Sequence, residues 1–345
     1  MNFSQKVLKW YGEHKRELPW RSTRDPYKIW LSEIILQQTR VVQGTPYYFK
    51  FVEAFPTVHD LAEAPEEKVL KLWQGLGYYS RARNLHATAK MIVEDFNGQF
   101  PSSYEGLKKL KGVGDYTASA IASICFDIPE PVVDGNVYRV LSRYFGIKTP
   151  INSTKGIKYF KELAREVMDT KNIRDYNQGI MEFGAIQCAP KKPYCLLCPL
   201  NDSCIALKEN SVQNLPVKLS KTKIKQRFFN YIVVLDPNGK TIVEQRLGKG
   251  IWQNLYQFPL IETENVAHQN EILKELESKP YGAFVKSIVL YNSEPVVHKL
   301  SHQHLYTQFW ILEVSNQLEQ GIPWDEIGSF AVPVLIADFI KTFKN

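Results

Sequence analysis

The stretch Leu110–Asp134 constrains the fold of this chain more than any other. It begins with two glycines, Gly112 and Gly114, and a run of small residues and isoleucines follows at 117–124. Glycines at a turn let the backbone approach another surface closely, and a helix directly behind them presents free N–H groups to an anion. Two prolines then stop the helix before Asp134. We expect a helix-hairpin-helix that grips a nucleic-acid backbone, although an ordinary turn remains the alternative.

A second constraint is a helix that is apolar on nearly every side. Residues 27–38 predict this helix, and Glu33 lies within it, opposite a stripe that runs from Tyr27 to Gln38. If both faces are covered, the carboxyl group is desolvated, its pKa rises, and it can hold a proton near neutral pH. Glu33 is therefore a candidate acid catalyst. A solvated surface glutamate is the competing interpretation.

The segment 73–84 combines glycines, the pair Tyr78 and Tyr79, and two arginines at a junction between two helical patterns. Aromatic rings that stack on bases and arginines that contact phosphates are typical of nucleic-acid binding. A tight turn with buried tyrosines explains the same residues without any ligand.

Four of the five cysteines fall within seventeen residues, and they are Cys188, Cys195, Cys198 and Cys204. Four thiolates at this spacing predict a metal centre. The spacing alone leaves both tetrahedral zinc and an iron–sulfur cluster open. Cys125 stands apart on an apolar helix and is expected to be a buried small hydrophobe.

The period of the hydrophobic pattern changes near residue 228. Before it the pattern is helical, at 3–17, 27–38, 41–54, 66–76, 81–95, 107–127, 135–145, 154–169 and 174–186. After it, β-branched and aromatic runs predict strands at Phe229–Leu235, Thr241–Gln245, Leu255–Leu260, Val285–Tyr291 and Tyr306–Val314, with helices at 267–278 and 332–343. We therefore expect an all-helical domain followed by an α+β domain, with 206–227 as the linker.

The positive charge is concentrated in the first part of the chain. Residues 1–225 carry a net charge of +10 and residues 226–345 carry −3. This asymmetry favours a polyanion as the partner of the helical domain, and the basic stretch 216–227 either follows a nucleic-acid backbone or is a solvated linker. No apolar run approaches the roughly 20 residues needed to span a bilayer, so we expect no membrane association and a cytoplasmic protein.

Six segments together resemble the endonuclease III family of DNA glycosylases and, within it, the adenine DNA glycosylases of the MutY type. These segments are LPWR (18–21), WLSEIILQQTR (30–40), WQGLGYYSRARNL (73–85), LKGVGDYTA (110–118), VDGNVYRVLSR (133–143) and CAPKKPYCLLCPLNDSC (188–204). The resemblance is dense over the first 205 residues and looser beyond them.

The resemblance implies a two-lobed helical domain at 1–205 with DNA between the lobes. The barrel lobe would cover about 22–130, and the other lobe, residues 1–21 and 131–205, would hold one 4Fe–4S cluster on the four cysteines. Residues 228–345 would form a Nudix-like domain that reads the lesion. The implied partner is double-stranded DNA with adenine opposite 8-oxoguanine or guanine, bound by a monomeric bacterial enzyme that associates with the nucleoid.

The implied reaction is hydrolysis of the N-glycosidic bond of a flipped-out adenine. Glu33 matches the general acid, and Asp134 matches the carboxylate that stabilises or captures the oxocarbenium ion. Tyr116 and Asn136 match residues that assist around the sugar. The DNA-contacting and lesion-contacting residues implied by the resemblance are Arg21, Leu36, Gln37, Gln38, Tyr78, Gly112, Gly114, Ser301 and His302.

Two departures refine this expectation. Bifunctional members carry a lysine in the hairpin where this chain has Tyr116, so no amine is available there for a Schiff base and a monofunctional glycosylase is expected. The lesion-reading segment of the family is Phe-Ser-His, and here it begins with Leu300. The alternative interpretation is that Ser301 and His302 merely end a strand. A lyase for oxidised pyrimidines and a non-catalytic DNA-damage binder remain the alternatives.

Overall fold

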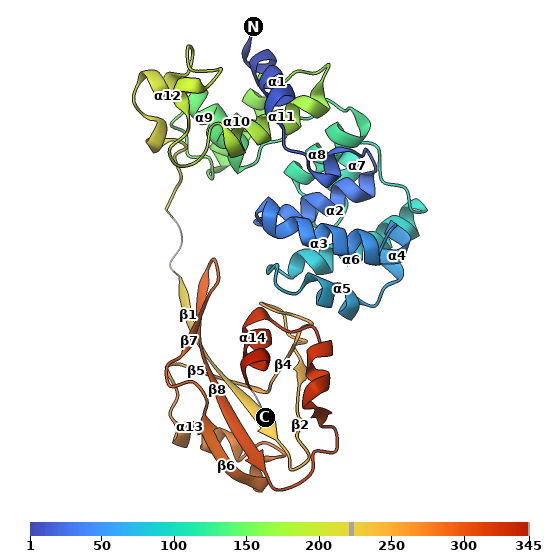
Figure 1. Ribbon diagram of the computed structural model, residues 1–345, viewed down its shortest axis with the longest axis vertical. Coiled ribbons are helices and arrows are strands. Elements are labelled where there is room, and N and C mark those ends of the chain that lie inside the picture. The colour runs from blue at the N-terminus through green and yellow to red at the C-terminus, as the bar shows by residue number, and fades with distance from the viewer. Residues whose placement is uncertain (221–223, 344–345) are drawn as a thin grey trace. The chain divides into compact units, whose positions relative to one another are not determined.

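The computed structural model describes residues 1–220 and 224–343, which form two compact units (Figure 1). The first unit comprises Met1–Glu63 and Asn84–Ser220. The second comprises Ala64–Arg83 together with the described residues from Ile224 onward. Among the described helices, none has the length and apolar character that crossing a membrane requires.

The first unit is helical throughout its described residues. Its helices are α1 (Phe3–His14), α2 (Pro26–Leu36), α3 (Val41–Ala54), α4 (Val58–Glu63), α7 (Tyr104–Lys108), α8 (Asp115–Phe126), α9 (Gly135–Phe145), α10 (Thr154–Val167), α11 (Ile173–Ile186) and α12 (Ile205–Lys208), with most of α6 (Ser80–Phe96). Short 3₁₀ turns lie at η1 (Pro19–Arg21), η2 (Cys195–Leu197) and η3 (Val212–Asn214).

Helices α2 and α8, which carry Glu33 and Tyr116, pack against each other. Helix α2 begins at Pro26 with Asp25 as its N-cap, and its residues from Ile29 to Ile35 are all buried. Helix α8 presents small residues, Ala118, Ala120 and Ala122, each with no exposed surface, so the two helices can pack closely. Helix α11 packs on α8 and also on α1 and α9, and it therefore joins the two helical groups visible in Figure 1.

The second unit is built on a five-stranded mixed sheet. Its strands are β1 (Lys225–Leu235), β5 (Leu260–Thr263), β6 (Val285–Leu290), β7 (Val296–Lys299) and β8 (Gln303–Val314). The order is β5-β1-β8-β6, and β7 pairs with β8 beside β6. Strands β1 and β8 run parallel over eleven residue pairs, whereas the other pairings are antiparallel. The small strands are β2 (Lys240–Thr241), β3 (Glu244–Gln245), β4 (Tyr256–Gln257) and β9 (Ile322–Pro323).

A helix covers each face of this sheet. The face that includes Trp310 and Leu312 packs with Ile272 and Leu276 of α13 (Gln269–Leu276). The opposite face is aromatic: Phe309 of β8 stacks on Phe339 of α14 (Val334–Thr342), with the ring centroids 4.1 Å apart. The α+β class expected from the sequence is confirmed.

The second unit also includes α5 (Glu66–Trp73) and the connection to α6. Lys71 donates to the carbonyl oxygens of Gly328 and Phe330, the latter at 2.8 Å, next to the 3₁₀ turn η5 (Trp324–Ser329). Arg83 donates to the carbonyl oxygen of Gln253 at 2.8 Å. The Tyr78 loop is therefore fastened at both of its ends to the sheet-bearing part of the chain.

The structure differs from the sequence expectations mainly at the ends of elements. The first helix ends at His14 rather than at residue 17, because Leu18 and Pro19 begin a separate turn. The expected strand Thr241–Gln245 is two short pieces, β2 and β3, that pair with different partners. Strand β7 was not expected, since only Val296 and Val297 carry a β pattern in that stretch.

Candidate active site

One cavity of about 720 Å³ in the helical unit gathers most of the predicted site residues. Ten of them line it, and they are Arg21, Glu33, Leu36, Gln37, Gln38, Gly112, Gly114, Tyr116, Asp134 and Asn136. They come from η1, from α2 and the two residues after it, from the hairpin and first turn of α8, and from the start of α9. A volume of this size suits a single nucleotide-sized ligand.

Glu33 is the buried acid of this cavity, with 8% of its surface exposed. Burial raises the pKa of its carboxyl group, and the nearby charge of Asp134 raises it further. A hydrogen bond with Tyr116 partly opposes these effects, and the resulting pKa is about 7. The apolar walls of α2 therefore produce the proton-holding carboxyl group that the sequence pattern predicted.

Tyr116 contacts both Glu33 and Met181 of α11. It stands one residue inside α8, so the hairpin fixes its place. Its hydroxyl interacts with Glu33 and lies 3.3 Å from the sulfur of Met181 on α11. Burial, followed by the charges of Glu33 and Asp134, raises its pKa well above the usual value, so the hydroxyl remains a neutral donor.

Asp134 is held in place by the helix that it caps. Its Oδ1 accepts hydrogen bonds from the backbone N–H groups of Asn136 (2.9 Å) and Val137 (2.8 Å), and its Oδ2 accepts one from the Asn136 side chain at 2.7 Å. Burial raises the pKa of Asp134, and these three donors oppose that rise. Because N–H donors at a helix N-terminus favour a carboxylate over a carboxylic acid, they stabilise the ionised form.

Sequence reasoning missed a further acid in the same cavity, beside Glu33 and Asp134. Glu182 of α11 is 2% exposed and accepts two hydrogen bonds from the side chain of Arg16 (2.8 and 2.7 Å) and two from that of Arg21 (3.1 and 2.9 Å). Burial acts to raise its pKa, but the hydrogen bonds from both arginines outweigh it and hold the pKa at about 2. No short motif marks this triad, because Glu182 is 166 residues from Arg16 and 161 residues from Arg21 in the chain.

The hairpin itself has the geometry of an anion site. Gly112 has a φ of +75°, and a Cβ there would approach the Asn84 side chain to 2.8 Å, so the turn requires glycine. Gly114 caps α8 without a side-chain hydrogen bond to its first N–H groups. Both glycines are exposed. The first turn of α8 can therefore offer its N–H groups to a phosphate.

A chain of hydrogen bonds leads from Asp134 to the cysteine loop. Asn136 donates to Asp134 and accepts a hydrogen bond from Arg139 at 2.8 Å. Arg139 also donates to the carbonyl oxygen of Cys188 at 2.8 Å. The first cysteine of the loop is thus connected to the carboxylate of the cavity by two side chains.

The four cysteines line one small apolar cavity with Arg143. Arg143 is 3% exposed and donates to the sulfur of Cys188 at 3.4 Å and to the carbonyl oxygens of Ala189 and Pro190. Neither Arg139 nor Arg143 forms a salt bridge with a carboxylate within the described part of the chain. Buried guanidinium groups require a countercharge, which thiolates of the four cysteines would supply. Backbone N–H groups also donate to Cys198 and Cys204. Among the described residues, no three histidine, cysteine, aspartate or glutamate side chains are close enough to share a single metal ion.

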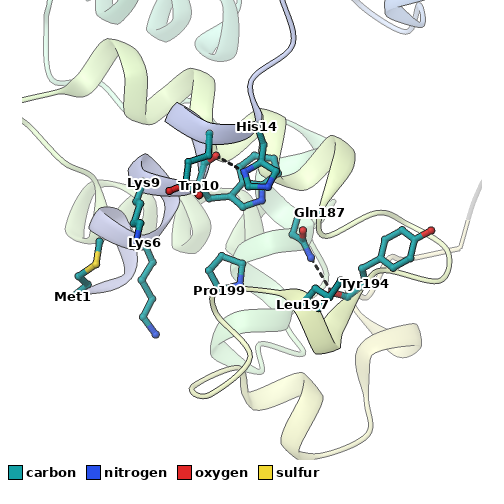
Figure 2. A pocket seen from close by; sticks show the side chains of 10 residues that line it. Met1, Lys6, Lys9, Trp10, His14, Gln187, Tyr194, Leu197 and Pro199 are labelled. Atoms are coloured by element: carbon teal, nitrogen blue, oxygen red, sulfur yellow. Dashed lines mark hydrogen bonds between the residues drawn. The ribbon is translucent and has the colours of Figure 1, made fainter.

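A separate cavity of about 590 Å³ lies between α1 and this loop (Figure 2). Trp10 stacks on His14 at its edge, with 5.0 Å between ring centroids. Gln187 donates from its side chain to the carbonyl oxygen of Tyr194 at 2.8 Å. Because Gln187 and Tyr194 directly precede Cys188 and Cys195, this bond fixes the spacing of the first two cysteines.

The remaining predicted residues, Tyr78, Ser301 and His302, line a cavity of about 510 Å³ in the second unit. Tyr78 is 50% exposed and has a φ of +47°, and Gln38 in the helical unit has a φ of +56°. Residues other than glycine that have a positive φ are strained, and they concentrate at functional sites. The Ser301 hydroxyl lies 3.2 Å from Nδ1 of His302.

Comparison with known proteins assigns both parts of the chain. Residues 31–177 match the HhH-GPD superfamily of base excision DNA repair proteins, and residues 230–342 match the NUDIX domain. Adenine DNA glycosylase of Buchnera aphidicola subsp. Baizongia pistaciae is 36% identical over 90% of this chain and 86% of its own length. The rat enzyme of the same name is 31% identical over 99% of this chain and 78% of its own length. The chain belongs to the adenine DNA glycosylase family.

Solved structures agree with this assignment of the helical part. A thermostable thymine-DNA glycosylase is 33% identical with a TM-score of 0.56, over 60% of this chain and 95% of its own. An endonuclease III trapped covalently on DNA shares the fold, at 23% identity and a TM-score of 0.53, over 60% of this chain and 94% of its own. The family resemblance inferred from the motifs is confirmed. This adenine DNA glycosylase family member is thus a DNA repair N-glycosylase with a helix-hairpin-helix domain.

Proposed function

We propose that this protein removes adenine mispaired with 8-oxoguanine or guanine from double-stranded DNA. The observation that carries the proposal is the pairing of two carboxyl groups in one cavity, Glu33 with a pKa of about 7 and Asp134 beneath three N–H donors. Adenine is a poor leaving group unless its ring is protonated, and the sugar then develops positive charge. Glu33 can supply the proton to the adenine ring, and Asp134 can stabilise the positive charge on the sugar.

In the proposed reaction, Glu33 donates its proton to N7 of a flipped-out adenine. The glycosidic bond breaks as adenine leaves, and Asp134 stabilises or captures the oxocarbenium ion before water completes the hydrolysis. Tyr116 supports Glu33 through its hydroxyl, and Asn136 holds Asp134. Glu182, ionised by its two arginines, holds Arg16 and Arg21 at the edge of the cavity.

The proposed enzyme is monofunctional. A lyase forms a Schiff base through an amine next to the sugar, and among the described residues no lysine lines the cavity. Tyr116 occupies the position that a lysine holds in bifunctional relatives. We therefore expect no covalent adduct when the enzyme and its product are treated with borohydride, and no strand break unless base is added.

DNA contact is supported by the hairpin and by the cysteine loop. The uncapped N–H groups at the start of α8 suit one phosphate, and the exposed Lys191 and Lys192 suit others. We propose that Cys188, Cys195, Cys198 and Cys204 hold one 4Fe–4S cluster. When bound, such a cluster supplies a folded loop and the countercharge for the buried arginines. Measuring iron and acid-labile sulfide per chain, with zinc as the alternative outcome, tests this assignment.

Lesion reading is assigned to the second unit. Tyr78, Ser301 and His302 share a cavity that also includes Arg83 and Trp252, so aromatic stacking and hydroxyl or imidazole donors converge there. We propose that this cavity contacts the oxidised guanine, and that the protein acts as a monomer. Ser301→Ala with His302→Ala should weaken binding to 8-oxoguanine mispairs more than binding to guanine mispairs.

The decisive experiment compares wild type with Glu33→Gln under single-turnover conditions on an adenine:8-oxoguanine duplex. Loss of a general acid should slow adenine release on the order of 100-fold to 10,000-fold, while the affinity for the duplex stays within about threefold. Glu13→Gln, at an exposed position of α1, is the control and should behave as wild type. Full activity of Glu33→Gln would show that Glu33 is not the general acid. Inactivity of the wild type on every adenine mispair would show that the proposed substrate is wrong.

A further inference from the structure

The segment 127–134 delivers Asp134 to the cavity without any regular secondary structure of its own. Helix α8 ends at Phe126, and α9 begins only after Asp134. Such a segment lacks a hydrogen-bonded ladder, so side chains from elsewhere must fix it. Arg24 and Arg165 pair with carboxylates of the segment. Two other side chains bond to its backbone, and both also hold α8, the helix that carries Tyr116.

Lys161 of α10 is the first of these side chains, and only 15% of it is exposed. Its ammonium donates to the carbonyl oxygen of Pro131 and to the hydroxyl of Ser119, both at 2.8 Å. It also lies 3.0 Å from the carboxylate of Asp115 and 3.8 Å from that of Glu130. Two of these four partners lie on α8, on either side of Tyr116, and two lie on the segment before Asp134.

Asn177 of α11 is the second, and it is 1% exposed. Its amide nitrogen donates to the carbonyl oxygen of Glu130 at 2.8 Å and to the hydroxyl of Ser123 on α8 at 2.9 Å. Its amide oxygen accepts from the backbone N–H of Val132 at 3.3 Å. Like Lys161, it bridges α8 and the segment before Asp134.

We propose that Lys161 and Asn177 are positioning residues for the glycosylase reaction, which set the place of Asp134 relative to Tyr116 and Glu33. The inference rests on the proposed function of the cavity. Packing alone does not require these residue types, because an apolar side chain fills the same space without the desolvation of an ammonium group. What the donors add is a fixed separation between two backbone segments. Misplacement of a reacting group by about 1 Å can cost on the order of 100-fold in rate.

The test uses Lys161→Met, which keeps the aliphatic stem and removes the ammonium, in the full-length protein. Lys158→Met is the matched control, since Lys158 lies on the same helix with 81% of its side chain exposed. We expect single-turnover adenine release to fall at least tenfold in Lys161→Met but not in the control, with the affinity for an uncleavable duplex within about threefold. Asn177→Asp, which removes the amide donors at constant size, should show the same pattern.

A second readout separates positioning from a general loss of structure. The charge of Asp134 contributes to the raised pKa of Glu33. An Asp134 that moves away from Glu33 therefore lowers this pKa and moves the alkaline limb of the pH–rate profile to lower pH. The other groups near Glu33 are Tyr116, which is hydrogen-bonded to it, and Cys125. The charged side chains of Arg16, Arg21, Asp115 and Glu182 also line the cavity. None of these side chains is replaced in either variant, but Lys161→Met leaves the carboxylate of Asp115 without its ion pair, whereas Asn177→Asp does not touch Asp115. A limb that moves to lower pH in both variants therefore reports the displacement of Asp134.

The outcomes distinguish this inference from the proposed function. If wild type releases adenine, Glu33→Gln does not, and Lys161→Met matches Lys158→Met, only the positioning role is wrong. A slower Lys161→Met whose pH limb is unmoved and whose DNA affinity falls in proportion also overturns it. If Asn177→Asp does not fold, the two lysine variants decide alone. Wild type without adenine release overturns the proposed function itself.

Discussion

At the scale of single residues, two carboxyl groups in one cavity are both buried but differ in their hydrogen-bond donors. Glu33 lies in the apolar wall of α2, where burial disfavours its charge and raises its pKa to about 7. Asp134 is also buried, but three N–H groups point at its oxygens. Environments that treat two acids differently assign them different roles in one reaction.

The first prediction concerns the pH dependence of adenine release. Because the proton on Glu33 is the reactant, the single-turnover rate should be constant below its pKa and should fall about tenfold for each pH unit above about 7. Single-turnover rates measured from pH 5.5 to 9 test this. The residual activity of Glu33→Gln should show no such limb, and a limb that persists in this variant would assign the titration to another group.

The second prediction concerns stability. Below pH 4.5 the Glu33 carboxyl group is protonated in both the folded and the unfolded chain. Between 4.5 and about 7 only the unfolded chain ionises, so this group lowers the folding stability progressively as pH rises. Above that window the cost is constant at about 3 kcal/mol. Denaturant unfolding of Glu33→Gln should show a gain over wild type that is larger at pH 8 than at pH 4. An equal difference at both pH values contradicts the raised pKa.

At the scale of elements, Asp134 serves both α9 and the reaction, and two variants separate these uses. Asp134→Asn keeps an oxygen acceptor for the N–H groups of Asn136 and Val137, whereas Asp134→Ala removes the cap. Loss of such a cap costs about 1 kcal/mol. Both variants should lose adenine release, but only Asp134→Ala should also unfold at a lower denaturant concentration. Retained activity in Asp134→Asn would show that the negative charge is unnecessary.

The elements also show how far the sequence alone could lead. The all-round apolar pattern of α2 predicted that Glu33 is buried, and the two glycines before α8 predicted the hairpin. The Arg16–Glu182 and Arg21–Glu182 pairs carry no such signal, because each is formed by helix packing between distant parts of the chain. The roles of Lys161 and Asn177 were invisible for the same reason: each bonds to backbone and side-chain groups whose proximity only the fold determines.

At the scale of the whole molecule, the sheet-bearing unit also includes a helical segment from the first part of the chain, residues 64–83. Residues 64–83 precede most of the helical unit in sequence, yet Lys71 and Arg83 are bonded to carbonyl groups beyond residue 250. This arrangement was not readable from periodicity, since α5 has an ordinary amphipathic pattern. It means that Tyr78 and Ser301 belong to one body and are placed together.

The fourth prediction follows from this arrangement. Lys71→Met should loosen the Tyr78 loop from the carbonyl groups of Gly328 and Phe330. We expect weaker binding to 8-oxoguanine mispairs, by several-fold in titrations with an uncleavable adenine analogue, and unchanged binding to an undamaged duplex. Lys90→Met, at an exposed position on α6, is the control. Equal losses on both duplexes would point to a general effect on DNA affinity.

The parallel pairing of β1 with β8 has a consequence for the synthesis of the protein. The two strands are adjacent in the sheet, but about 70 residues separate them in the chain. During translation, β1 therefore leaves the ribosome before β8, and the backbone N–H and C=O groups that pair with β8 remain unpaired until β8 is synthesised. Unpaired strand edges associate with other chains. Premature termination between residues 236 and 302 should consequently yield an insoluble product, whereas a stop before residue 224 omits the vulnerable strand altogether.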